Sequence, residues 1–87
     1  MDMVMADRHT SPIRRLTESG QRWRVSVETW QERDAYHGRL LFHREANAES
    51  GARASAPLLH GRSREDVLGL AHDLPEEKLR RVLHSLG

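Results

Sequence analysis

Alternating apolar and polar residues in the first half of the chain predict two β-strands. From Arg22 to Trp30, the sequence RWRVSVETW places Trp23, Val25 and Val27 on one side, the period of two expected of a strand with one buried face. The segment AYHGRLLFHR, residues 35–44, alternates in the same way. A short polar connector, QERD, joins the two runs, so we expect an antiparallel hairpin with a loop of about four or five residues.

The segments on either side of this hairpin carry less periodicity. Residues 53–60, RASAPLLH, predict a third strand, which Pro57 confines to a sheet edge or ends, because proline has no amide hydrogen to donate. Residues 1–12 show no periodicity and predict a flexible N-terminal tail, leaving residues 13–87 as a single domain. A short helical turn over residues 13–19 is also compatible with the sequence.

The C-terminal segment SREDVLGLAHDLPEEKLRRVLHSLG predicts two helices. Ser63 and Asp73 stand at N-cap positions, each followed three residues later by an acidic residue. The helices are expected at 64–72 and 75–86. Gly69, inside the first of them, costs about 1 kcal/mol relative to alanine, which we interpret as a sign of close packing on the sheet.

These elements predict an α+β fold, in which a three-stranded antiparallel β-meander is followed by two C-terminal α-helices packed on one face. A chain of 87 residues has room for one domain. The residues expected in the core are Trp23, Val25, Val27, Tyr36, Leu40, Phe42, Leu58, Val67, Leu70, Leu79, Val82, Leu83 and Leu86.

Charge does not single out a partner. The chain has 14 Lys and Arg residues against 13 Asp and Glu, a net charge of +1, whereas dedicated nucleic-acid-binding domains are usually strongly basic. Five arginines and a single acid, Glu18, nevertheless fall between Arg8 and Arg24. The preference for arginine over lysine, with abundant alanine, glycine and histidine, is typical of a GC-rich bacterial genome.

Composition and segment lengths favour a cytoplasmic protein. The chain has no cysteine, which excludes disulfides, thiolate chemistry and cysteine-based zinc sites. No segment approaches the roughly 20 apolar residues of a membrane-spanning helix, and the N-terminal sequence MDMVMADRHTSPIRR lacks the apolar run of a signal peptide.

Six histidines are the main compositional oddity. His37 and His43 fall on one face of the same predicted strand, but six residues separate them by about 20 Å, so they cannot share an ion. His60, His72 and His84 each fall at or near the end of an element, with no acidic ligand placed beside them by local spacing. We therefore expect surface or capping roles, with no metal and no cofactor.

No catalytic constellation is evident. Capping explains the position of Ser63, and the carboxylate pairs Glu65-Asp66 and Glu76-Glu77 fall in helical first turns, where the helix dipole favours them. A nucleophile elbow, a phosphate-binding Walker loop and a dinucleotide glycine fingerprint are all absent from the sequence. The sequence predicts a protein that is not an enzyme.

Two binding classes remain, both using the sheet face that the helices are expected to leave free. The candidate residues on that face are Arg24, Trp30, His37, Arg39, Leu41 and His43. An exposed apolar patch of Trp30 and Leu41 inside a polar rim favours a protein partner or a homodimer. On this hypothesis, alanine at either position weakens binding and leaves folding largely intact. The alternative is a weak nucleic-acid-binding module that uses the arginines and aromatic rings of the same face.

The entry into the first helix, GRSREDVL at residues 61–68, is similar to that of HicB-type antitoxin domains. Those domains also enter a helix through a glycine, a Ser/Thr cap and an acidic turn. They carry a Pro-Asp-Leu-Pro-Gly-like segment before this point, and this sequence has none, so the resemblance transfers no function.

Overall fold

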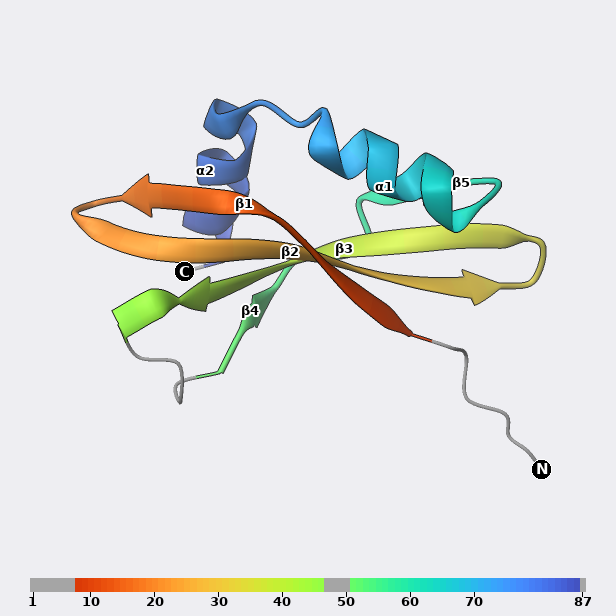
Figure 1. Ribbon diagram of the computed structural model, residues 1–87, viewed down its shortest axis with the longest axis horizontal. Helices are drawn as coiled ribbons and strands as arrows, with labels where there is room; N and C mark the ends of the chain where they lie inside the picture. The colour runs from red at the N-terminus through yellow and green to blue at the C-terminus, as the bar shows by residue number, and fades with distance from the viewer. Residues whose placement is uncertain (1–7, 47–50, 87) are drawn as a thin grey trace.

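The computed structural model describes residues 8–46 and 51–86, which form an antiparallel sheet with two helices on one face (Figure 1). The strands β1, β2 and β3 lie side by side in that order, and β4 and β5 both pair with β3. The predicted α+β class, with three long antiparallel strands followed by two C-terminal helices, is confirmed. The elements are β1 (His9–Glu18), β2 (Gln21–Glu32), β3 (Ala35–Arg44), β4 (Arg53–Ala54), β5 (Leu59–Gly61), α1 (Arg64–His72) and α2 (Glu76–Ser85).

The three long strands are not the three that the sequence predicted, because β1 replaces the predicted tail and helical turn. Residues 9–12, predicted to belong to a flexible tail, are part of β1, and the helical turn predicted over 13–19 is wrong. Residues 1–7 of the predicted tail lie outside the described residues. The sheet therefore begins one strand earlier than expected.

A tight turn and a bulge explain why β1 escapes the sequence pattern. Ser19 and Gly20 both have positive φ, 55° and 77°, and form a two-residue hairpin loop whose twist matches that of the flanking strands. The β1–β2 register shifts between Pro12 and Arg14. A bulge of this kind changes the phase of alternation, so that residue 13 packs against the core and Leu16 is buried in it. Ile13 and Leu16 are therefore apolar residues three apart, a spacing that is also typical of a helix.

The hairpin of β2 and β3 is the part of the sheet that the sequence predicts best. Its register runs without a shift from Trp23 opposite Arg44 to Glu32 opposite Ala35. The connecting turn is only residues 33–34, shorter than predicted, because both strands extend into the expected loop. Because the β2–β3 register contains no bulge, Trp30 falls on the opposite face from Trp23.

The predicted third strand is split into β4 and β5. Ser55 interrupts it: its amide donates to the Leu40 carbonyl and its hydroxyl accepts from the Leu40 amide, both at 2.9 Å. Residues 56–58 form no strand, as the proline at position 57 would lead one to expect. The Leu58 amide then donates to the Gly38 carbonyl at 3.1 Å, and β5 begins. The edge of β3 is thus covered by two short strands and a connecting loop.

Both helices lie where the sequence places them, but only one has the predicted cap. Ser63 caps α1, its hydroxyl accepting from the Asp66 amide at 3.0 Å. Asp73 does not cap α2; it ends α1, and Pro75 occupies the N-cap position of α2 without a side-chain hydrogen bond. Over the described residues, neither helix combines the length and the apolar character needed to cross a membrane.

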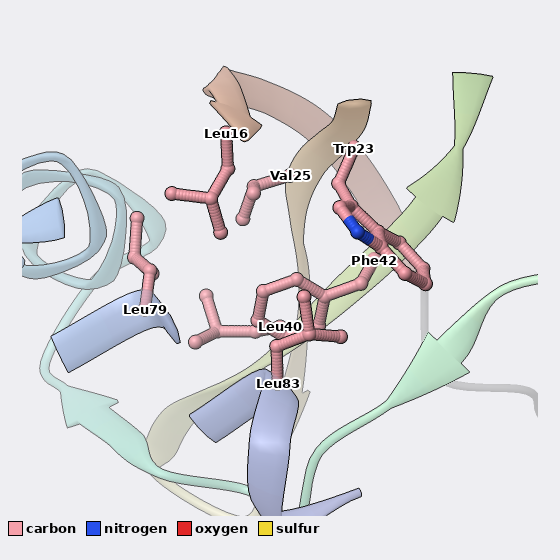
Figure 2. Close-up of a cluster of buried hydrophobic side chains, with 7 residues drawn as sticks. All are labelled: Leu16, Trp23, Val25, Leu40, Phe42, Leu79 and Leu83. Carbon is pink, nitrogen blue, oxygen red and sulfur yellow. The ribbon is translucent and has the colours of Figure 1, made fainter. Parts of the chain in front are cut away.

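The core consists of two adjoining clusters between the sheet and the helices. Figure 2 shows the first, in which α2 contributes Leu79 and Leu83 against side chains from β1, β2 and β3. The second lies beneath α1 and contains Val27, Leu59, Val67 and Ala71. The buried members of the first cluster are Leu16, Trp23, Val25, Leu40, Phe42, Leu79 and Leu83.

Most of the predicted core is confirmed, and two leucines are corrections. Leu58 and Leu70 are 46% and 45% exposed. Leu58 precedes β5, and the next residue, Leu59, is buried in its place. In α1 the buried residues are Val67 and Ala71, four apart on one helical face, so residue 70 points away from the sheet. The remaining predicted core residues are buried or, for Tyr36, Val82 and Leu86, partly buried.

Gly38 on β3 and Gly69 within α1 give a matched test of how closely this helix approaches the sheet. A Cβ added at Gly38 would lie 2.5 Å from Cγ1 of the buried Val67, whereas a Cβ at Gly69 would meet nothing within 4 Å. Gly69 is exposed, so its predicted packing on the sheet is wrong. We predict that Gly38→Ala lowers the free energy of unfolding by about 1–3 kcal/mol through overpacking.

Gly69→Ala is the control, and it should raise the free energy of unfolding by about 0.5–1 kcal/mol because alanine is the better helix former. Urea unfolding followed by circular dichroism measures both. A Gly38→Ala protein as stable as the wild type would mean that α1 does not sit this close to β3.

Candidate interaction face

The side of the sheet opposite α1 and α2, called here the helix-free face, carries alternate residues of the long strands. Val25 and Val27 point into the core beneath the helices, so their neighbours along β2 point the other way. No helix of the described chain covers these neighbours (Figure 1). The register places all six candidate residues on this face: Arg24 and Trp30 from β2, and His37, Arg39, Leu41 and His43 from β3.

A row of three nitrogen-rich side chains crosses the helix-free face near the β1–β2 turn; we call it the basic row. Arg15 of β1 lies directly opposite Arg24 of β2, which lies directly opposite His43 of β3. Like charges placed opposite one another in a sheet are destabilising. The Arg15 Nε lies 3.2 Å from Oε2 of Glu45, which offsets part of this repulsion. Folding alone therefore gives no reason to place Arg24 beside Arg15.

Beside the basic row, four uncharged residues form a strip across the sheet, called here the apolar strip. Pro12, Ser26, Leu41 and Ala54 follow one another across four strands. Leu41 is half-buried, and Pro12 and Ala54 are exposed. The strip offers a small apolar surface next to the positive charge of the basic row.

The next pair on this face toward the β2–β3 turn is Glu28 opposite Arg39. The Glu28 carboxylate lies between two guanidinium groups. Oε1 of Glu28 accepts from Arg39 Nε at 2.6 Å and from an Arg8 terminal nitrogen at 3.3 Å. The Glu28 side chain is largely buried beneath its partners, which keep about two fifths of their surface exposed. Arg39 is therefore already engaged within the protein, unlike the arginine at position 24, for which the described residues provide no ion pair.

Trp30 lies on the predicted face, but its predicted exposure is wrong. The side chain is only 7% exposed. The His37 ring stacks on it with centroids 5.9 Å apart, and the Arg8 guanidinium carbon lies 4.4 Å from the indole centroid. Arg8 comes from a segment predicted to be a tail, so this contact could not be predicted from the sequence pattern. The apolar part of the helix-free face is consequently Leu41 with its strip, without the indole.

Two histidines that the sequence pattern did not place together are in contact where β3 pairs with β5. His37 and His60 are directly opposite one another on β3 and β5, and their Nδ1 atoms are 2.8 Å apart. The predicted separation of His37 from His43 holds, since the latter pairs with Arg24 at the other end of β3. The contact with His60 could not be found from local spacing because it depends on where β5 joins the sheet.

A shallow pocket of about 190 Å³ lies at the other end of the molecule, on the core side of the sheet. The Arg44 and Arg53 guanidinium carbons lie 5.3 and 5.1 Å from the ring centroid of Trp23, which lines the pocket. Glu18, also in the lining, forms an ion pair with His84. Because acidic and basic groups mix here, the pocket has no single sign of charge with which to select a ligand.

Neither the side-chain clusters nor the comparisons with known proteins identify an activity. Over residues 8–46 and 51–86, no three histidine, aspartate or glutamate side chains come together as a metal-binding group. No protein-family model, curated protein or solved structure matches the chain. A function must therefore be argued from the chemistry of the helix-free face itself.

The burial of Trp30 reverses one expectation of the sequence. Trp30→Ala should lower the free energy of unfolding by about 3 kcal/mol, as for other buried large aromatic side chains, instead of leaving folding intact. Leu41→Ala, at a half-buried position on the same face, should cost about 1 kcal/mol or less. Urea unfolding of the two variants compares them directly, and equal small losses would mean that the cover over Trp30 does not form.

The like charges of the basic row predict an unusual gain in stability. Arg24→Thr should raise the free energy of unfolding by a few tenths of a kcal/mol, because it removes the repulsion and introduces a better strand former. The gain should shrink at high salt, where exposed charges are screened. Arg39→Thr is the matched control on β3 and should lower stability by up to about 1 kcal/mol, because it breaks the contact with Glu28. A loss of stability in Arg24→Thr would contradict the repulsion.

Proposed function

We propose that this chain is a non-enzymatic, cytoplasmic protein-binding module whose helix-free face docks an acidic segment of a partner protein. The observation that carries the proposal is the basic row of Arg15, Arg24 and His43 beside the apolar strip. Such a row works against the stability of the free protein. An acidic partner would remove that repulsion on binding.

The chemistry of the row indicates the kind of partner. Arginine guanidinium groups bind carboxylates through two parallel hydrogen bonds, which gives geometric selectivity in addition to attraction. Leu41, half-buried in the middle of the face, supplies an apolar centre with charged residues around it, an arrangement common at protein interfaces. We therefore infer that the partner segment carries aspartate or glutamate residues together with an aliphatic side chain.

The free edge of the sheet is less suited to binding than the face. Edge strands of natural proteins are protected from pairing by proline, bulges and charged residues. β1 has Pro12 and a bulge directly after it, and Arg80 from α2 donates to the Thr17 carbonyl at 3.1 Å. These features support docking through side chains on the face over pairing of backbones along β1.

A nucleic-acid partner remains the second candidate, because the same arginines could bind phosphates. Proteins that bind single strands also need exposed aromatic rings on which bases stack. Trp30, the aromatic residue among the candidates on this face, is only 7% exposed. This burial favours the protein partner.

The proposal predicts charge-selective peptide binding. Immobilised wild-type protein panned against a library of random displayed peptides should enrich sequences rich in Asp and Glu with one aliphatic residue. Arg24→Glu should weaken binding of the enriched peptides by about ten-fold or more, equivalent to about 1.4 kcal/mol. Fluorescence polarisation with a labelled peptide measures the change, and added salt should weaken wild-type binding.

Arg81→Glu is the matched control, since Arg81 is exposed on α2, on the opposite side of the sheet, and it should leave binding unchanged. Equal loss in both variants would indicate non-specific attraction and contradict the proposal. Failure to enrich acidic peptides, combined with Arg24-dependent binding of a single-stranded oligonucleotide, would replace the protein partner with the nucleic-acid alternative.

A further inference from the structure

The pair of histidines on β3 and β5 has a geometry that goes beyond the proposed docking function. His37 and His60 lie directly opposite one another, so their side chains emerge on the same face. Their ring centroids are 4.9 Å apart and the ring planes are nearly perpendicular, at 89°. The two Nδ1 atoms are 2.8 Å apart, which means that one of them donates a hydrogen bond to the other when both rings are neutral.

We propose that His37 and His60 form a two-histidine site for Cu(II) or Ni(II). Both metals take imidazole nitrogens in square-planar or tetragonal geometry. With metal–nitrogen bonds of about 2.0–2.1 Å, the observed 2.8 Å between Nδ1 atoms corresponds to an angle of about 84–89° at the metal. That is the angle between neighbouring ligands of a tetragonal ion. A tetrahedral zinc ion would instead need the nitrogens about 3.3–3.4 Å apart.

Binding requires the rearrangement of one proton and a tilt of the two rings. When both imidazoles are neutral, one carries its proton on Nδ1 and the other offers a lone pair there. The first ring takes the alternative neutral tautomer, with its proton on Nε2, and rotation about the side-chain torsions turns the two Nδ1 lone pairs, which face one another in the hydrogen bond, toward one ion. The metal replaces the shared proton, and water fills the other positions, since the described residues supply no third ligand.

The surrounding structure holds the two rings in place. The His37 ring stacks on the indole of Trp30. Burial of the indole restricts its movement, which holds the His37 ring in turn. β5 is held from beneath, because the preceding strand residue, Leu59, is buried and a Cβ added at Gly61 would lie 2.8 Å from the Asp66 Cβ at the start of α1. His60 itself is exposed, so an ion can reach the site. Metal binding therefore needs little movement of the backbone.

The positive charges next to the proposed site are partly balanced by a carboxylate. Arg39, two residues along β3 on the same face, and Arg8, above the indole, both bind the carboxylate of Glu28. One negative charge thus offsets part of two positive ones. Two ligands and this residual charge imply an affinity well below that of sites with three or four protein ligands.

Tryptophan fluorescence gives a direct test with the full chain. Cu(II) quenches nearby fluorophores, so titration of CuCl2 should quench the emission of Trp30 with a stoichiometry of one ion per chain. Electron paramagnetic resonance should show two nitrogen ligands. His60→Ala should weaken binding by about ten-fold or more, with an unchanged circular dichroism spectrum because the side chain is exposed.

His43→Ala is the matched control, because His43 lies on the same strand and face but is paired with Arg24, and it should bind Cu(II) as the wild type does. Equal weakening in both histidine variants, absence of one-to-one binding, or zinc binding more tightly than Ni(II) would overturn the proposed site. Because the readouts involve no protein partner, their failure would leave the docking proposal untouched.

Discussion

The continuous register between β2 and β3 is the constraint on which the rest of the structure depends. Side chains alternate between the two faces of a strand, so a slip of one residue would exchange the faces completely. In the observed register, Val25 faces Phe42 and Val27 faces Leu40 in the core, while Arg24 faces His43 on the other side. Burial of the first pairs against the helices therefore fixes the second pair as well. The helix-free face is set by the core and needs no interactions of its own to define it.

This dependence explains how the helix-free face can tolerate unfavourable neighbours. Two arginines opposite one another lower the stability of the sheet. They do not shift its register, because the core residues on the apolar side determine that register. The ends of the face differ in consequence. At one end, Glu28 binds both Arg8 and Arg39 and Trp30 is buried, while at the other end Arg15 pairs with Glu45 and Arg24 keeps its charge exposed. The docking function proposed above rests on this exposed positive charge.

The sequence predicts the elements whose information is local and misses those that depend on distant contacts. The alternation of β2 and β3 and the capped start of α1 are visible because each is encoded within about ten residues. β1 is missed because a bulge brings Ile13 and Leu16, three residues apart, to one face of a largely polar strand. The split of the third strand follows from Ser55 bonding to Leu40 on another strand.

The candidate site divides in the same way. Alternation along β2 and β3 is enough to predict that all six candidate residues share one face, because all six lie within this hairpin. The burial of Trp30 depends on Arg8, and the pairing of His37 depends on His60, 23 residues away in sequence. Neither contact leaves a periodic signal, because each results from the docking of a different segment onto β2 or β3.

The two sites proposed on the helix-free face are far enough apart to act separately. His37 and His43 mark their positions on β3, six residues and therefore about 20 Å apart, which is about two and a half Debye lengths at physiological ionic strength. A metal ion at one end would thus add little to the attraction of an acidic partner to the basic row. A coupling between the two would have to come from a partner long enough to span both, with a carboxylate placed to complete the coordination of the ion. The length of the docked segment, more than the charge of the face, would decide whether the protein senses metal and partner together.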